Sequence, residues 1–168
     1  WYIFTNNSII KYSQFMNISY LAMTDIPSKN ANSLQIVQMC SAFSALGHNV
    51  KLITPNFDIT NNSSYRNYYG VKNIFDIVKI GNKKKRLSKL DNIILPFRLC
   101  LYSLKQKNNT IITRNLVVSL LLIVLRKKHI LEIHDDLKSA GKKISKIFRV
   151  LSLLNSSKIK KIVFITKN

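Results

Sequence analysis

The sequence predicts an α/β fold built on a doubly wound, mostly parallel β-sheet. From residue 17 onward, short apolar runs alternate with helix-length amphipathic segments, and this alternation is typical of successive βαβ units. Such units imply a parallel sheet whose connections are right-handed. The chain has 168 residues, of which 46% are hydrophobic, so it is long enough to bury roughly 70% of its extended surface in one domain.

The first βαβ unit is the clearest one. Residues 17–23 are an apolar run of strand length, and a polar loop follows them. Ser33 is a suitable N-cap for a helix over residues 34–46, in which apolar side chains recur at helical spacing. Gly47 stands where the end of a helix favours a left-handed residue, and residues 50–54 form the next strand candidate.

The remaining elements repeat this rhythm. The predictions, in chain order, are a polar and aromatic loop at 56–69, a strand at 74–80, a basic loop at 81–85, a helix within 87–107, a strand at 110–113, a helix at 116–127, a strand at 129–133, a helix at 144–154 and a strand at 159–165. Pro96 is expected either to start or to kink its helix. Residues 16–168 are therefore predicted to form one Rossmann-like domain.

The beginning of the chain does not fit this pattern. Residues 1–15 are aromatic and rich in Asn, the first residue is Trp1, and the first methionine is Met16. We interpret residues 1–15 as a leader that is either non-native or disordered. Either Met16 is the natural start of the protein, or the chain is a fragment of a longer reading frame.

The net charge of +20 is the strongest feature of the composition. It favours contact with polyanions such as nucleic acid, anionic lipid or phosphorylated substrates, but the joint abundance of Lys, Asn and Ile also indicates a general compositional bias. Few basic residues alternate with aromatic ones, as a nucleic-acid surface requires, so nucleic acid is not the expected partner. The basic cluster at residues 83–86 is either a solvated loop or a contact with an anionic membrane.

Cysteine usage and hydropathy bear on the location of the protein. Cys40 and Cys100 have neither metal-binding nor redox spacing, which suggests a reducing cytoplasm. The most apolar run, residues 116–125, is about half as long as a bilayer span and is interpreted as a buried helix. The expected location is the cytoplasm, with peripheral contact at the inner face of the membrane.

Residues at the carboxyl ends of the predicted strands are the candidates for a ligand site, because open parallel sheets bind ligands there. The rule selects the loop after the first strand, the residues after the strand at 110–113 and those after the strand at 129–133. The candidates are Ser28, Lys29, Asn30, Ala31, Asn32, Ser33, Arg114, Asn115, His134 and Asp135.

The loop at residues 28–33 leads into a helix, whose free N–H groups and dipole attract phosphates and other anions. It contains no glycine, so neither the dinucleotide fingerprint nor the phosphate-binding P-loop is present. An anion site and an ordinary capped loop are equally good interpretations of its spacing.

The charged candidates also have two interpretations each. His134 can donate a hydrogen bond to a sugar hydroxyl or shuttle a proton, or it can cap the end of its strand. Arg114 is suited to phosphate or carboxylate binding, or to an internal ion pair with Glu132 or Asp135. One histidine beside two carboxylates is not a convincing metal-ligand set, so no metal is expected.

Several of these segments resemble one protein family. The resemblance is to family 4 glycosyltransferases, in the branch whose first loop reads P-S-x-x-A-N-S, and it begins at residues 26–35 (IPSKNANSLQ) and 46–50 (LGHNV). Later landmarks of that branch follow in the same order, at residues 68–71 (YYGV), 112–115 (ITRN) and 131–135 (LEIHD). The last one is similar to the strand before the crossing to a second domain, at residues 163–168 (VFITKN).

The resemblance implies a GT-B architecture, in which two Rossmann-like domains face each other and this chain is the N-terminal one. The N-terminal domain of such enzymes receives the acceptor, the C-terminal domain holds the nucleotide-sugar, and transfer retains configuration without a metal. By this resemblance, residues 28–33 border the acceptor and the donor phosphates, His134 hydrogen-bonds the donor sugar near the reacting centre, and Arg114 shapes the acceptor side. A nucleotide-sugar is the expected co-substrate, with no other cofactor, and the acceptor is a saccharide or lipid-linked saccharide of a surface-polysaccharide pathway.

The sequence departs from this family in one respect. The second domain, whose basic pair and spaced glutamates hold the diphosphate and the ribose, is missing, and neutralising the departing diphosphate is usually a large part of catalysis. The chain alone is therefore predicted to be inactive and to need a nucleotide-binding partner domain. The alternative function, drawn from the net charge alone, is a non-catalytic basic α/β module that binds nucleic acid or another polyanion.

Overall fold

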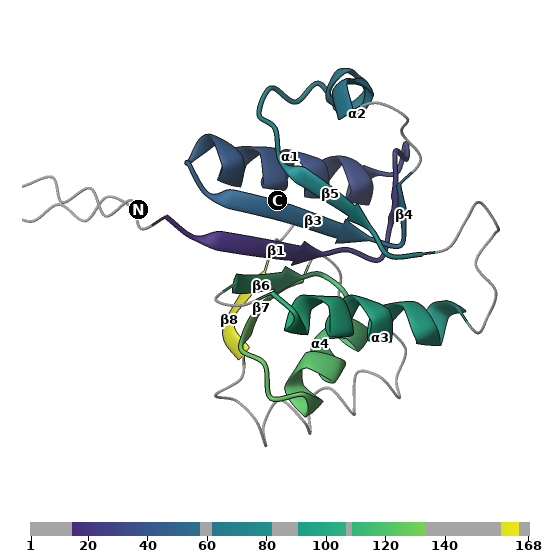
Figure 1. Ribbon diagram of the computed structural model, residues 1–168, viewed down its shortest axis with the longest axis vertical. Helices are drawn as coiled ribbons and strands as arrows, with labels where there is room; N and C mark the ends of the chain where they lie inside the picture. The colour runs from purple at the N-terminus through teal and green to yellow at the C-terminus, as the bar shows by residue number, and fades with distance from the viewer. Residues whose placement is uncertain (1–14, 58–61, 82–90, 107–108, 134–158, 165–168) are drawn as a thin grey trace, which may run out of the picture.

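The computed structural model describes residues 15–57, 62–81, 91–106, 109–133 and 159–164, and their central feature is a six-stranded sheet (Figure 1). Its strands are β1 (Asn17–Leu21), β3 (Asn49–Thr54), β5 (Asp76–Lys79), β6 (Asn109–Thr113), β7 (His129–Ile133) and β8 (Ile159–Phe164). Every pair of neighbouring strands is parallel, and the order across the sheet is β5-β3-β1-β6-β7-β8. The predicted fold class, a doubly wound α/β fold of the Rossmann-like type, is confirmed.

Helices cover both faces of this sheet. Helix α1 (Ala31–Ala45) lies on one face, and α3 (Asp91–Leu104) and α4 (Leu116–Val124) lie on the other (Figure 1). Successive strand residues point to opposite faces, so β1 sends Tyr20 into the cluster that contains Ile36 and Leu21 into the cluster that contains Leu99 and Leu122. The core is thus two apolar layers separated by the sheet.

Two further short elements lie beyond the ends of β1 and β3. The two-residue strands β2 (Asp25–Ile26) and β4 (Asn56–Phe57) pair in parallel and form a second, small sheet. Helix α2 (Asn62–Tyr69) follows β4. The prediction of a loop over 56–69 is therefore wrong for most of that segment, because Tyr65 and Tyr69, one helical turn apart, are both buried against the core. Their spacing is hidden in the sequence by the Asn and Ser residues around them.

The start of α1 also differs from the prediction. The helix begins at Ala31, and Asn30 occupies the N-cap position without a side-chain capping bond. Ser33 is buried inside the first turn, where its Oγ lies 2.7 Å from Thr24 Oγ1 and donates to the Asp25 carbonyl oxygen at 3.3 Å. The predicted N-cap role of Ser33 is wrong, because this hydroxyl ties the helix to the preceding loop instead.

Other boundaries are close to the predicted ones. Gly47 adopts φ +85° after α1, as the left-handed position requires, and Pro96 lies inside α3 rather than at its start. The predicted helix at 144–154 lies outside the described residues, as do residues 1–14 of the leader. Among the helices that the structure describes, none combines the length and the apolar character needed to cross a bilayer.

Candidate functional site

The strand order creates a switch point between β1 and β6. If the strands of the large sheet are numbered along the chain, their spatial order is 3-2-1-4-5-6, in which the direction of winding reverses between strands 1 and 4. The chain leaves β1 toward α1 on one face and leaves β6 toward α4 on the other (Figure 1). The loop at 28–33 and the pair Arg114 and Asn115 therefore flank the position at which such sheets bind ligands.

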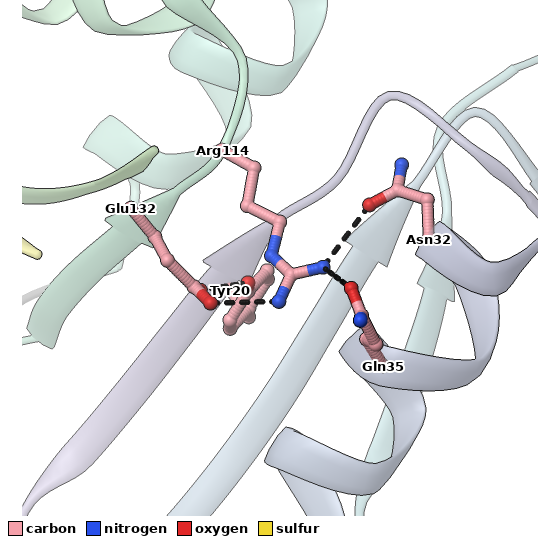
Figure 2. Close-up of polar contacts among 5 residues, drawn as sticks. All are labelled: Tyr20, Asn32, Gln35, Arg114 and Glu132. Carbon is pink, nitrogen blue, oxygen red and sulfur yellow. Dashed lines mark hydrogen bonds and ion pairs between the residues drawn. The ribbon is translucent and has the colours of Figure 1, made fainter. Parts of the chain in front are cut away.

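Arg114 connects three elements at this point (Figure 2). Its Nη2 lies 2.7 Å from Glu132 Oε1 of β7, and its Nη1 donates to Asn32 Oδ1 at 3.1 Å and to Gln35 Oε1 at 3.3 Å, both on α1. The Arg114 and Glu132 side chains are only 9% and 5% exposed. Of the two interpretations of Arg114, the internal ion pair with Glu132 is the arrangement that the structure has.

The carboxylate of Glu132 has a second partner in β1. Tyr20 Oη donates to Glu132 Oε2 at 2.6 Å, and both residues are buried. Burial raises the pKa of Tyr20 strongly, and the negative charge of Glu132 raises it further, so the phenol stays a donor. Burial alone lowers the pKa of Arg114, but the hydrogen bond to Glu132 and the negative charge of that carboxylate outweigh it, and the net pKa is raised. The guanidinium therefore stays charged beside its carboxylate.

This arrangement fixes the orientation of two amide side chains. A guanidinium can only donate hydrogen bonds, so Asn32 and Gln35 must turn their oxygens toward Arg114, as Figure 2 shows. Both residues are exposed, and their amide nitrogens remain for other partners. The first two turns of α1 thus carry two oriented donor groups of the kind that bind hydroxyl and phosphate oxygens.

The loop before α1 is held in place from several sides. Tyr69 Oη of α2 accepts from Ser28 N at 2.6 Å and donates to the Ser28 carbonyl oxygen at 3.1 Å. The hydroxyl of Thr54, at the end of β3, donates to the carbonyl oxygen of Thr24. Within this loop, the two residues of β2 also pair with β4. The conformation of residues 24–28 is therefore set by their neighbours.

The predicted loop residues separate into two groups in this arrangement. Four of them are exposed, namely Lys29, Asn30, Ala31 and Asn32. Ser28 is partly buried and its Oγ accepts from Asn30 N at 3.2 Å, whereas Ser33 is fully buried. The first group can reach a ligand directly, and the buried hydroxyl of Ser33 supports the loop from beneath.

The helix start itself suits an anion. No side chain caps the first turn of α1, and this turn has no acidic residue. The N–H groups of a first helical turn have no partner within the helix, and the positive end of the helix dipole lies there. Together with the amides of Asn32 and Gln35, they form a surface of hydrogen-bond donors.

Asn115 occupies the other side of the switch point. Its Oδ1 accepts from Val117 N at 2.9 Å and from Val118 N at 3.1 Å, which caps α4. Its own N–H donates to Thr113 Oγ1 at 3.2 Å. The oxygen of Asn115 is thus committed to the helix, and contact with a substrate is left to its amide nitrogen.

Two predicted site residues, His134 and Asp135, lie outside the described residues. They directly follow Ile133, the last residue of β7, and β7 is the neighbour of β6 in the sheet. Within the described ranges, no group of three or more His, Cys, Asp or Glu side chains is arranged to hold a metal ion.

Three members of the network, Tyr20, Gln35 and Glu132, are not among the predicted site residues, although Glu132 is predicted as a possible ion-pair partner of Arg114. A sequence signal for Tyr20 does exist, because Glu132 lies between Leu131 and Ile133 in an apolar part of its strand, and a buried carboxylate needs both a counter-charge and donors. That requirement points to a hydroxyl elsewhere in the sheet, and Tyr20 provides it from β1, with β6 between β1 and β7. Gln35 has no such signal, since an exposed glutamine on a helix is ordinary.

His129 and the two cysteines are also buried in the core. His129 is buried at the start of β7, its Nδ1 donates to the Lys127 carbonyl oxygen at 3.0 Å, and its Nε2 accepts from Ser119 Oγ at 2.7 Å. Burial lowers the pKa of His129. Cys40 and Cys100 are free and buried.

Comparison with known proteins adds no assignment to this geometry. The chain matches no protein-family model and no curated protein. The chemical capacity of the site therefore follows from the residues themselves. They are donor groups for anionic or hydroxyl oxygens, held at the carboxyl edge of a parallel sheet by a buried ion pair.

Proposed function

We propose that this domain is the N-terminal, acceptor-side half of a retaining, nucleotide-sugar-dependent glycosyltransferase of the GT-B type. The observation that carries the proposal is the bridge from Arg114 to Glu132 and to Asn32 and Gln35. It joins the start of α1 to the end of β7, two residues before His134, at the switch point of the sheet. These are the segments in which the sequence resembles family 4 glycosyltransferases.

The side chains at the start of α1, at the carboxyl edge of the sheet, support a sugar or sugar phosphate as the ligand. Sugar hydroxyls need several directed hydrogen-bond partners, and the exposed amides of Asn30, Asn32 and Gln35 provide them. Lys29 and the uncapped first turn of α1 add positive potential for a phosphate. The ligand surface is polar and carries no acidic side chain in the first turn of that helix.

The proposal gives different roles to Arg114 and His134. Arg114 is a positioning residue, because its guanidinium already donates to Glu132, Asn32 and Gln35. His134 hydrogen-bonds the donor sugar near the reacting centre. The leaving diphosphate is neutralised by a second, nucleotide-binding domain, so the chain alone transfers no sugar.

We also propose that the protein works in the cytoplasm at the inner face of the membrane, in a surface-polysaccharide pathway. The acceptor is a saccharide or a lipid-linked saccharide. This part of the proposal rests on the resemblance and on the net charge of +20, which favours anionic partners.

The test is to add the domain that the proposal requires. The chain is joined to the nucleotide-binding domain of a family 4 glycosyltransferase, and release of nucleoside diphosphate is measured with a panel of nucleotide-sugars and saccharide acceptors. We expect acceptor-dependent release that chelators do not abolish, and none from the chain alone. Transfer by the chain alone would contradict the division of roles, and no release with any donor would contradict the proposed function.

A further inference from the structure

The outer face of α3 exposes large apolar side chains. Ile94, Phe97 and Leu101 are 50%, 48% and 41% exposed, and their spacing of three and four residues places them on one side of the helix. The opposite side packs Leu99 and Cys100 into the core. Helix α3 therefore has an apolar inner face, as the fold requires, and a second apolar stripe that no described part of the chain covers.

Two cations share this outer face. Arg98 is four residues after Ile94, and Lys105 is four residues after Leu101, just beyond the last helical residue. Both are exposed, and neither forms an ion pair with a described residue. Apolar and cationic side chains thus alternate along one surface, which we call the α3 outer face and define by Ile94, Phe97, Arg98, Leu101 and Lys105.

We propose that the α3 outer face docks on the surface of an anionic lipid bilayer. A helix that lies in a membrane interface buries its apolar side chains at the boundary of headgroups and acyl chains, while Lys and Arg contact lipid phosphates. The composition of the α3 outer face fits that environment on both counts.

The charge of the protein disfavours a second copy as the occupant. Two chains that each carry +20 repel one another, and cations on the docking face itself would meet. Nucleic acid is disfavoured as well, because exposed aliphatic side chains such as Ile94 and Leu101 do not stack on bases as aromatic platforms do.

The position of α3 relates this surface to the candidate site. In a right-handed crossover the helix runs antiparallel to the strands, so α3 begins at the carboxyl edge of the sheet (Figure 1). Arg114 and the loop at 28–33 lie at the same edge, because they follow the strands β6 and β1. A docked bilayer therefore borders the edge at which a lipid-linked acceptor enters. This consequence rests on the proposed function, whereas the docking itself does not.

Cosedimentation of the full chain with lipid vesicles tests the proposal. Vesicles of phosphatidylcholine are compared with vesicles that also contain phosphatidylglycerol, at increasing salt. We expect binding that requires phosphatidylglycerol and weakens as salt rises. Arg98→Gln with Lys105→Gln should weaken binding about 25-fold, about fivefold for each charge. Phe97→Ser with Leu101→Ser should weaken it at least about tenfold.

Matched variants test whether a loss of charge or of an apolar side chain at exposed positions outside α3 has the same effect on binding. Lys72→Gln with Lys128→Gln removes the same charge from exposed positions outside α3, and Leu46→Ser removes an apolar side chain that is 68% exposed after α1. We expect these control variants to weaken vesicle binding no more than about twofold, which is on the order of what a distant, screened charge contributes. The seven substituted positions are all exposed, so each of the four variants should keep the near-ultraviolet circular dichroism of the parent chain.

Three results would overturn the proposal. They are absence of binding to the anionic vesicles, binding that the α3 variants and the control variants lose equally, and a concentration-dependent dimer in light scattering that only the α3 variants abolish. The assay contains neither donor nor acceptor, so its failure leaves the proposed transfer untouched. Conversely, a failure of sugar transfer in a protein that still binds vesicles would contradict the proposed function and not the docking proposal.

Discussion

Arg114 and Glu132 form an ion pair between the ends of two adjacent parallel strands, and the pair is almost completely buried. The register explains their meeting, because Thr113 pairs with Leu131 and the next residue on each strand is a member of the ion pair. The same guanidinium reaches the first turn of α1. One side chain thus couples the stability of the sheet to the shape of the candidate site.

Removing one charge of this pair should destabilise the fold strongly. Arg114→Met removes the guanidinium that contacts the buried carboxylate of Glu132, and Glu132→Gln removes the charge beside Arg114, so each should lower the free energy of unfolding by about 3–5 kcal/mol. Denaturant unfolding measures this. Arg98→Met, at an exposed position of α3, is the matched control and should change stability by about 0.5 kcal/mol or less.

The double variant separates the ion pair from simple loss of packing. Arg114→Met with Glu132→Gln removes both charges, so it should be less destabilised than the sum of the single variants. Additive losses would mean that the two side chains do not interact in solution.

The hydroxyl of Tyr69 should hold the loop before α1. In Tyr69→Phe, the amide and carbonyl groups of Ser28 lose their partner, which should cost about 1–2 kcal/mol. Amide hydrogen exchange at Ser28 should become faster, while exchange in β1 stays slow. Tyr68→Phe, at the half-exposed neighbour, is the control, and equal effects of the two substitutions would argue against the clamp.

His129 should make stability depend on pH. Burial lowers its pKa in the folded state, so below the ordinary pKa of about 6.5 the unfolded chain binds more protons than the folded one. The free energy of unfolding should therefore fall as pH decreases from 7.5 through 6.5, by at most about 1.4 kcal/mol per pH unit. His129→Asn should flatten this part of the profile, and an unchanged slope would show that His129 is not the responsible group.

Both cysteines should resist thiol reagents while the protein is folded. Burial raises the pKa of the Cys100 thiol to about 12 and raises that of Cys40 as well, and the thiolate is the reactive form. Labelling with a chromogenic disulfide at pH 8 should be slow in buffer and complete in denaturant. Rapid labelling in buffer would place at least one thiol at the surface.

The sequence reveals the sheet well because its signals are local. In the sequence, each strand of the large sheet is marked by a short apolar run between polar turns. A parallel sheet that is buried on both faces requires such runs. The positions of α1, α3 and α4 follow from the same alternation. The role of Gly47 at the end of α1 can be predicted from the sequence, because few other residues tolerate a φ of +85°.

The sequence reveals the site less completely because its contacts are distant along the chain. Tyr20 and Glu132 are 112 positions apart, and nothing local distinguishes this tyrosine from one that merely packs. Ser33 has the sequence position of an N-cap, yet its hydroxyl forms a hydrogen bond with the hydroxyl of Thr24, and the side chain is buried. Helix α2 was missed since two buried tyrosines, rather than an apolar stripe, hold it to the sheet.

The most direct test of the central claim is the turnover of His134→Ala in the two-domain protein, measured together with its unfolding midpoint. If the carboxyl edge that Arg114 organises is a glycosyl-transfer site, turnover should fall about 100-fold or more, as for loss of one transition-state hydrogen bond, while the midpoint stays within the range of a neutral surface variant. Unchanged turnover, or a loss of turnover that only follows a loss of folding, would contradict the claim.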